Sequence, residues 1–203
     1  MTARPKTRYS FEDYLAIERE QDSRNEYVDG QVYAMTGAKE NHKLIVTNLI
    51  VAIGNQLKGR ACRVYANDMK VRIDLADAST YPDVLALGGE RQFHDQRRDI
   101  ICNPSLIVEV LSPSPEAHDR RQRHLALYRR LPSLQDYLLI SQDRMAAELY
   151  TRQADGRWLM SGFDQEQQVI RLDSVDCEIP LAEIYDKIEF EVQDTPRVFP
   201  RPS

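Results

Sequence analysis

Helical spacing of apolar residues marks two long segments of the chain. Within residues 39–58 an apolar residue recurs at every fourth position, at Ile45, Leu49, Ile53 and Leu57. Gly59 follows them, where a glycine commonly ends a helix. Residues 116–131 form the second long helical segment. A shorter helix is expected at about residues 10–20, because Ser10 precedes Asp13 by three positions, close to the spacing of a capping box.

Strand patterns fill most of the remaining chain. Residues 69–75 alternate between apolar and polar, whereas residues 105–111 form a nearly continuous apolar run typical of a buried central strand. Asp29-Gly30 lies between β-prone residues and predicts a hairpin, because both turn residues need a positive φ. Other strands are expected at 81–87, 137–140, 145–151, 157–163, 168–172 and 177–181, with a short helix at 181–188. The order predicts an α/β domain whose main sheet is flanked by helices.

The chain is expected to form a single domain at residues 9–192. Residues 1–8 and 193–203 are expected to be tails, and Pro196, Pro200 and Pro202 discourage regular structure in the second. A length of 203 residues suits one domain.

Composition and charge exclude several classes of protein. The chain has 27 Lys and Arg against 32 Asp and Glu, which argues against a basic protein that coats nucleic acid nonspecifically. Its apolar runs are shorter than the about 18 residues of a membrane span, and its first residues lack the apolar segment of a secretion signal. Cys62, Cys102 and Cys177 are too far apart to suggest a disulfide framework or a thiolate zinc site. A cytoplasmic protein without a membrane partner is expected.

Two carboxylates carry the strongest chemical signal. Glu109 interrupts the buried strand at 105–111, and a buried carboxylate is costly unless it is paired, protonated or bound to a metal. A side chain that reaches solvent or an arginine is an equally good interpretation of Glu109 alone. Pro82-Asp83 begins another strand, and this dipeptide alone is more often structural. Together, two carboxylates on neighbouring strands could hold Mg²⁺, which prefers oxygen ligands and keeps several waters.

A basic run follows the buried strand. It extends from His118 to His124, with Arg129-Arg130 beyond it, and on a helix it forms a wide basic face. For part of the run a solvated helix surface is the better interpretation. The remainder could contact a phosphate backbone or stabilise negative charge at a reacting phosphate.

Taken together, these motifs resemble the Uma-two family of restriction-endonuclease-like proteins in the PD-(D/E)XK nuclease superfamily. The resemblance covers about residues 8–190. It rests on Tyr81-Pro82-Asp83-Val84, residues 107–114, Asp119-Arg120, Tyr128 and residues 131–137, with residues 26–30, His42 and residues 67–72 as further matches.

The resemblance implies a restriction-endonuclease-like core, a central mixed β-sheet flanked by helices, here with an additional C-terminal hairpin and strand region. It also implies metal-dependent cleavage of DNA phosphodiesters with Mg²⁺, or alternatively Mn²⁺. Asp83, Glu109 and the Val110 carbonyl would hold the metal, and Glu26 would orient the attacking water. His42 matches a frequent family position, for which packing or capping is as reasonable as catalysis.

One position departs from the family pattern. The superfamily lysine usually stands two residues after the glutamate, where this chain has Leu111. In the Uma-two group the lysine comes instead from the following helix, and Arg123 occupies that position here. Arginine can stabilise phosphate charge but cannot act as a neutral base. Lys70 is the nearest alternative lysine in the sheet region.

The leading hypothesis is a Mg²⁺-dependent endonuclease in which Asp83 and Glu109 hold the metal, Glu26 assists and Arg123 stabilises the phosphate. A nuclease-fold protein that binds DNA or regulates, with little or no cleavage, is the second. A structural oligomer whose strand carboxylates pair with arginines is the third. Nucleases of this type act on two strands, so a homodimer is expected.

Overall fold

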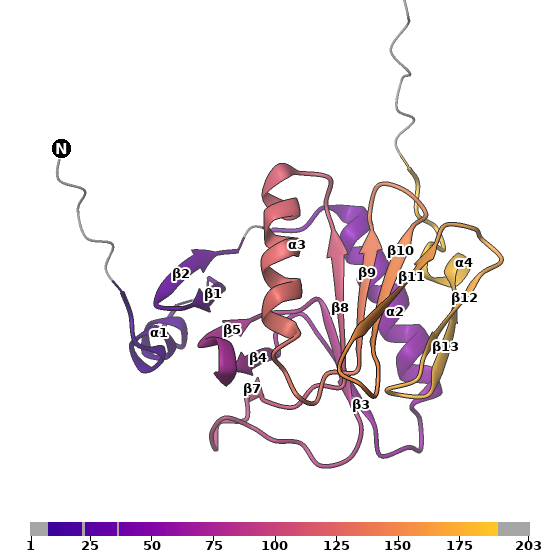
Figure 1. The fold of residues 1–203 in the computed structure, drawn as a ribbon. Coiled ribbons are helices and arrows are strands. Elements are labelled where there is room, and N and C mark those ends of the chain that lie inside the picture. The colour runs from indigo at the N-terminus through magenta and orange to yellow at the C-terminus, as the bar shows by residue number, and fades with distance from the viewer. Residues whose placement is uncertain (1–7, 22, 36, 191–203) are drawn as a thin grey trace, which may run out of the picture.

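A computed structural model describes residues 8–21, 23–35 and 37–190, and two large β-sheets organise them (Figure 1). The larger sheet has six strands in the order β11-β10-β9-β8-β6-β3. Its strands are β3 (Arg63–Ala66), β6 (Val84–Leu87), β8 (Leu106–Leu111), β9 (Asp136–Ser141), β10 (Ala147–Arg152) and β11 (Trp158–Phe163). β8 and β9 run parallel and the other pairs run antiparallel, so the sheet is mixed, as expected.

Helices cover both faces of the six-stranded sheet (Figure 1). α2 (Glu40–Gln56) packs on one face, where Leu49 joins Val108 in a shared apolar core. α3 (Pro115–Tyr128) crosses the other face, where Leu127 joins Ile107. Successive side chains of β8 point to opposite faces, and both faces are covered. This is why the run at 105–111 is apolar at nearly every position.

The five-stranded sheet, in the order β2-β1-β5-β4-β7, carries the first helix. Its strands are β1 (Asn25–Val28), β2 (Gln31–Ala34), β4 (Lys70–Ile73), β5 (Ala78–Thr80) and β7 (Ile100–Ile101). α1 (Phe11–Glu18) begins at the capping box expected from Ser10 and Asp13. Asp29 and Gly30 have φ values of 46° and 77° in the turn between β1 and β2, as the hairpin prediction requires.

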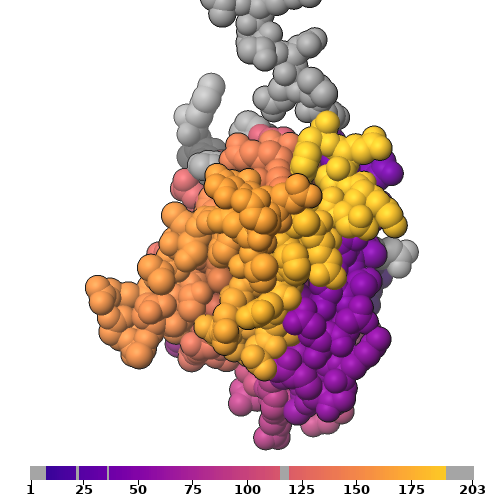
Figure 2. Space-filling view, turned by 90° about the vertical axis from the view of Figure 1, so that its right-hand side faces the viewer, coloured from indigo at the N-terminus to yellow at the C-terminus, as the bar shows by residue number. Residues whose placement is uncertain are grey.

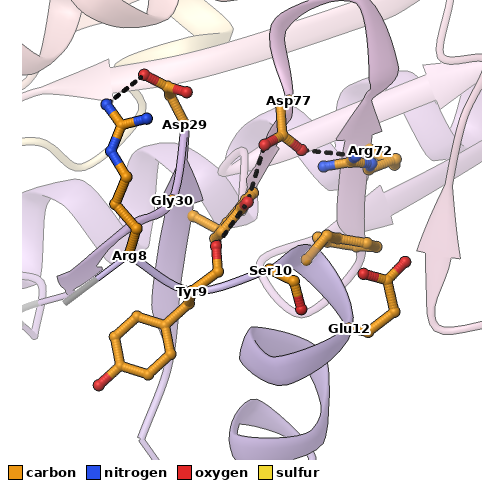
Figure 3. Close-up of a pocket in the computed structure, with 10 residues that line it drawn as sticks. Arg8, Tyr9, Ser10, Glu12, Asp29, Gly30, Arg72 and Asp77 are labelled. Atoms are coloured by element: carbon orange, nitrogen blue, oxygen red, sulfur yellow. Dashed lines mark hydrogen bonds and ion pairs between the residues drawn. The ribbon is translucent and has the colours of Figure 1, made fainter.

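Charged residues around a small surface pocket tie α1 to this sheet (Figure 3). The guanidinium of Arg72 lies 3.8 Å from the centre of the Phe11 ring and donates a hydrogen bond of 2.9 Å to Asp77. The Tyr27 hydroxyl donates a hydrogen bond of 2.8 Å to the same carboxylate. These polar groups satisfy one another, so the pocket serves the packing of the N-terminal helix.

The C-terminal region packs on α2 (Figure 2). It contains the hairpin of β12 (Val169–Leu172) and β13 (Cys177–Pro180), followed by α4 (Leu181–Ile184). Asn48 on α2 donates to the carbonyls of Ile184 and Asp186, and Gln56 donates to the carbonyl of Glu178. The short strands expected at 168–172 and 177–181 thus pair with each other and belong to the layer that covers one face of the main sheet.

Some element boundaries differ from the sequence predictions for local reasons. The strand expected at 69–75 ends at Ile73, because Asp74–Ala76 forms a 3₁₀ turn that leads to Asp77 with a φ of 42°. The strand expected at 81–87 begins at Val84, after Pro82, which has no N–H to donate to a ladder. The helix expected at 181–188 ends at Ile184.

The expected tail residues 1–7 and 193–203 lie outside the described residues. No helix among the described residues is long and apolar enough to cross a membrane. The three cysteines are free thiols.

The burial of α2 generates a stability prediction. Leu49 is 0% exposed, whereas Val51 on the same helix is 52% exposed. Leu49→Ala should lower the free energy of unfolding by about 2–5 kcal/mol, because it leaves a cavity in the core. Val51→Ala should change it by less than about 0.5 kcal/mol. Urea unfolding measures both, and equal effects would contradict the orientation of α2.

Candidate functional site

The residues that the sequence singles out for chemistry line one cavity of about 590 Å³. They are Glu26, His42, Asp83, Glu109, Val110 and Arg123. β1 and β2 of the smaller sheet, the start of α2, the end of β8 and the inward face of α3 contribute the walls. The cavity therefore lies at the junction of the two sheets. Lys70 is not among the lining residues; its ammonium group lies 3.7 Å from Asp99.

Asp83 lies immediately before β6, and its two carboxylate oxygens have different neighbours. Its Oδ2 accepts a hydrogen bond of 2.7 Å from the Val110 N–H, and its Oδ1 lies 3.1 Å from Nε2 of His42. Burial and the nearby charge of Glu109 raise the pKa of Asp83 well above its usual range. Without a cation beside it, the ionised form of Asp83 is therefore disfavoured.

Pro82 explains how a backbone carbonyl becomes available beside this carboxylate. The pairing of β6 with β8 ends with Val84 opposite Val108, and continued in the same register it would set Pro82 opposite Val110. Proline has no N–H, so it cannot donate to the Val110 carbonyl across the ladder. The Val110 N–H already donates to Asp83. The Pro-Asp pair thus removes one ladder donor and supplies a carboxylate at the same point.

Glu109 is held from the side of α3. It is 5% exposed, its Oε1 accepts a hydrogen bond of 2.8 Å from the Tyr128 hydroxyl, and the same oxygen lies 3.1 Å from Nδ1 of His124. Thr80 lies 3.1 Å from the Tyr128 hydroxyl and completes this chain of hydrogen bonds. Glu109 is therefore shielded from solvent, and within the described part of the chain it is held by a histidine and a tyrosine and forms no ion pair with an arginine.

His124 connects the two sheets through a buried charge cluster that sequence reasoning missed. Its Nδ1 faces Glu109 and its Nε2 lies 3.1 Å from Oε1 of Glu26, so both ring nitrogens point at carboxylates. Burial alone would lower the pKa of His124, but the two carboxylates outweigh it and raise the pKa to about 9. The imidazole is therefore a buried cation at neutral pH.

Arg120 completes the balance of charge around Glu26. Its Nη2 donates a hydrogen bond of 3.1 Å to Oε1 of that carboxylate. Burial opposes ionisation of Glu26, yet His124 and Arg120 together lower its pKa to about 2. Arg120, His124 and Tyr128 recur at every fourth position of α3, and this spacing is the signal by which one inward-facing stripe could have been found.

The basic run on α3 is partly turned inward. The guanidinium of Arg123 lies 4.4 Å from the centre of the Tyr33 ring, with Nη2 4.0 Å from Glu26. Arg121 pairs with Glu148 on β10. Arg123 therefore lines the cavity near Glu26, with its guanidinium over the Tyr33 ring.

The donor set suits a hard divalent cation. Among the described residues, the hydrogen bonds to Glu109 go to Oε1 and the one to Asp83 goes to Oδ2, which leaves one oxygen of each carboxylate. With the Val110 carbonyl these are oxygen ligands, and Mg²⁺ completes such a set with water. The described residues contain no preformed cluster of three or more acidic, histidine or cysteine side chains for a metal. A cation here would therefore depend on the carbonyl and on water.

Comparisons with known proteins show what the chain as a whole is similar to. The model of the Uma2 family, described as "Putative restriction endonuclease", matches residues 11–182. An uncharacterized protein of Synechocystis sp. is 37% identical over 186 residues, which are 92% of this chain and 96% of the relative. A second one is 33% identical over 149 residues, which are 73% and 84% of the two chains.

A solved structure shares the fold. It is described as a putative nuclease belonging to DUF820 from Anabaena variabilis, and it superposes with a TM-score of 0.69. The match covers 88% of this chain and 98% of the other at 19% sequence identity.

The charge on His124 makes stability depend on pH. Its folded pKa of about 9 lies above the ordinary value of 6.5, so its contribution is complete below pH 6.5 and is lost as pH rises through 9. That difference corresponds to about 3 kcal/mol. Urea unfolding in chelator should show the fall in the wild type and a much smaller fall in His124→Gln. The exposed His94 provides the control, because His94→Gln should keep the wild-type profile.

Asp83 is expected to lower stability when no metal is present. Its raised pKa means that its charge opposes folding at neutral pH. Asp83→Asn, measured in chelator at neutral pH, should therefore raise the free energy of unfolding by roughly 1–3 kcal/mol. Asp68→Asn removes a carboxylate whose side chain is 87% exposed, and it should have little effect. A loss of stability in Asp83→Asn would contradict the conclusion that burial and the charge of Glu109 make an ionised Asp83 unfavourable.

Proposed function

The chain belongs to the Uma2 family, and from that premise we propose that it is an endonuclease that hydrolyses DNA phosphodiester bonds with a divalent cation, Mg²⁺ or Mn²⁺. One observation carries the proposal. Asp83 and Glu109 each have one anchored oxygen and one remaining oxygen at the wall of a shared cavity. Buried carboxylates are otherwise costly, and a cation would offset the burial and the repulsion by Glu109 that together raise the pKa of Asp83.

In the proposed reaction Asp83, Glu109 and the Val110 carbonyl would hold the cation. A bound divalent cation would polarise the phosphodiester and lower the pKa of the attacking water. The Val110 N–H and the Tyr128 hydroxyl fix the two carboxylates in place before substrate arrives. Such preorganisation is what makes a charged site effective.

Donors on the opposite wall suit the negative charge of a phosphate. Among the described residues, Nε of Arg120, Nε of Arg123 and the hydroxyl of Tyr137 are buried without a hydrogen-bond partner. All three residues line the cavity. An anionic phosphate would supply acceptors for these donors. In this proposal Arg123 stabilises the scissile phosphate from the position of the missing lysine.

Glu26 takes a positioning role in this proposal. Its contacts go to Arg120 and His124, and Arg123 lies close by. These contacts favour Glu26 as the group that orients the cationic wall. The family resemblance implies that Glu26 orients the attacking water. With these contacts, Glu26 would act on the water only through Arg120, His124 or Arg123.

A second function remains a specific alternative. Leu111 occupies the usual lysine position, and arginine at 123 cannot accept a proton at neutral pH. A protein that binds metal and DNA but cuts slowly or not at all would have the same cavity. Two-strand cleavage would require two copies of the site, so a homodimer is part of the nuclease proposal, and sedimentation equilibrium would measure it.

Cleavage of supercoiled plasmid and single-stranded DNA tests the proposal. With Mg²⁺ or Mn²⁺ we expect nicking by the wild type and at least a 100-fold loss in Asp83→Ala and in Glu109→Ala, because each removes a metal ligand. Asp155→Ala, in the exposed turn between β10 and β11, is the matched control and should keep full activity.

A variant at Arg123 distinguishes the nuclease from the DNA-binding protein. If neither the wild type nor the carboxylate variants nick DNA but Arg123→Lys does, the wild type is the DNA-binding protein of the second hypothesis. Nicking that persists in both carboxylate variants would place the activity elsewhere and overturn the proposed site.

A further inference from the structure

β11 is an edge strand that exposes apolar side chains. It ends the six-stranded sheet, so one of its sides has no neighbouring strand among the described residues. Figure 2 shows the hairpin of β10 and β11, coloured orange, at the surface. Leu159 and Met160 on β11 are 56% and 54% exposed. Edge strands are usually short or charged, because an unpaired edge can bind another strand.

The other outer strands of the two large sheets are shorter than β11. β3 and β2 have four residues each and β7 has two, and β3 begins with the exposed Arg63. β11 has six residues and contains neither a charge nor a proline. Of these four strands, β11 is therefore the one best able to accept a partner strand.

The backbone of β11 directs alternate residues to its open side. The carbonyl of Arg157, just before the strand, accepts a hydrogen bond of 2.7 Å from the Gln153 N–H and so points toward β10. This direction alternates along an antiparallel pair. The N–H and C=O groups of Trp158, Met160 and Gly162 therefore point away from β10.

We propose that β11 pairs in antiparallel orientation with β11 of a second copy of this chain, so that two main sheets join into one. A two-fold dimer uses the same surface of both copies. Among the symmetric registers, the one centred on Met160 pairs all three outward residues. Met160 then lies opposite its own counterpart, and Trp158 of each copy lies opposite Gly162 of the other.

The side chains of β11 are complementary in size in this register. Apart from its neighbours in the chain, a Cβ atom at Gly162 would meet no heavy atom within 4 Å, so the space beside it is open. Trp158 of the other copy would cover this space, as aromatic residues do for glycines in edge strands. On the opposite face of the sheet, Leu159 of each copy would lie opposite Ser161 of the other.

The charges that flank β11 also fit this register. Arg157 precedes the strand and Asp164 follows it, and the Arg157 side chain is 85% exposed where it pairs with Asp155 in the turn. Asp164 of one copy would lie opposite Gly156 of the other, one residue from Arg157. Opposite charges therefore come near each other at both ends of the pair, and no like charges face each other along residues 156–164.

The inference goes beyond the proposed function, because it names a surface outside the cavity. β8 and β11 run in the same direction, so the two-fold rotation would place the two cavities at opposite edges of the joined sheet. Each cavity would then act separately. The dimer can be tested without any measurement of cleavage.

Sedimentation equilibrium of the full-length protein over a wide range of concentrations tests the interface. The wild type should dimerise, and Met160→Lys should weaken dimerisation by at least about 10-fold, because two like charges would face each other at the axis. Leu75→Lys is the matched control. Leu75 is 67% exposed in the 3₁₀ turn after β4, so this variant should dimerise like the wild type.

A mixture of two variants tests the register. Met160→Glu alone should dimerise as weakly as Met160→Lys, for the same reason. An equimolar mixture of the two should form a heterodimer, because opposite charges then face each other at the axis. Circular dichroism of each variant establishes that it is folded.

The outcomes separate this inference from the proposed function. A dimer that Met160→Lys leaves intact would overturn this interface and leave a homodimer through another surface. Loss of the dimer in both variants without recovery in the mixture would overturn the register centred on Met160. A wild type that stays monomeric would overturn the interface and the homodimer, whereas nicking of DNA that depends on Asp83 would still support the proposed site.

Discussion

The arrangement of this protein depends on the cost of bringing three carboxylates into one partly closed cavity. Glu26, Asp83 and Glu109 come from two different sheets, and their charges repel in a medium less polar than water. α3 balances two of them with His124 and Arg120, whose contacts lower the pKa of Glu26 and raise that of His124. Asp83 alone is left without sufficient compensation, and its raised pKa records this. The unbalanced carboxylate is the one beside His42, whose ring nitrogens have no hydrogen-bond partner among the described residues.

The fold places the compensating helix where the charges require it. β8 and β9 are parallel neighbours, so the chain must cross from the end of one to the start of the other, and α3 makes this crossing over one face of the sheet. The same helix therefore closes the core and carries Arg120, His124 and Tyr128 past the cavity. On the opposite face α2 fills the core with Leu49 and presents His42 from its first turn. The same two helices both pack the core and carry residues that line the candidate site.

Local signals predicted much of this structure from sequence. The hairpin at Asp29-Gly30, the cap at Ser10 and the buried strand around Glu109 follow from short-range rules, and the structure confirms them. The Pro-Asp pair was recognisable because its partner strand also carried a carboxylate. The role of His124 was not, because Glu26 lies 98 positions away in the sequence and belongs to the other sheet. The periodicity of α3 does not indicate which carboxylates its residues contact. Those contacts follow only from the three-dimensional arrangement of the elements.

The distance in sequence between these charged residues also affects how the protein folds during its synthesis. The two strands with Asp83 and Glu109 are synthesised before α3, so a nascent chain that ends near residue 111 contains the acidic groups without the cations that offset them. Non-local contacts of this kind form late, because the loop that joins them must first be closed. The parallel pairing of β9 with β8 adds a further requirement, since it needs the whole crossover. On the ribosome, the cavity thus becomes complete only once the chain has passed β9, and until then a growing polypeptide carries the carboxylates of the cavity without the groups that surround them in the folded protein.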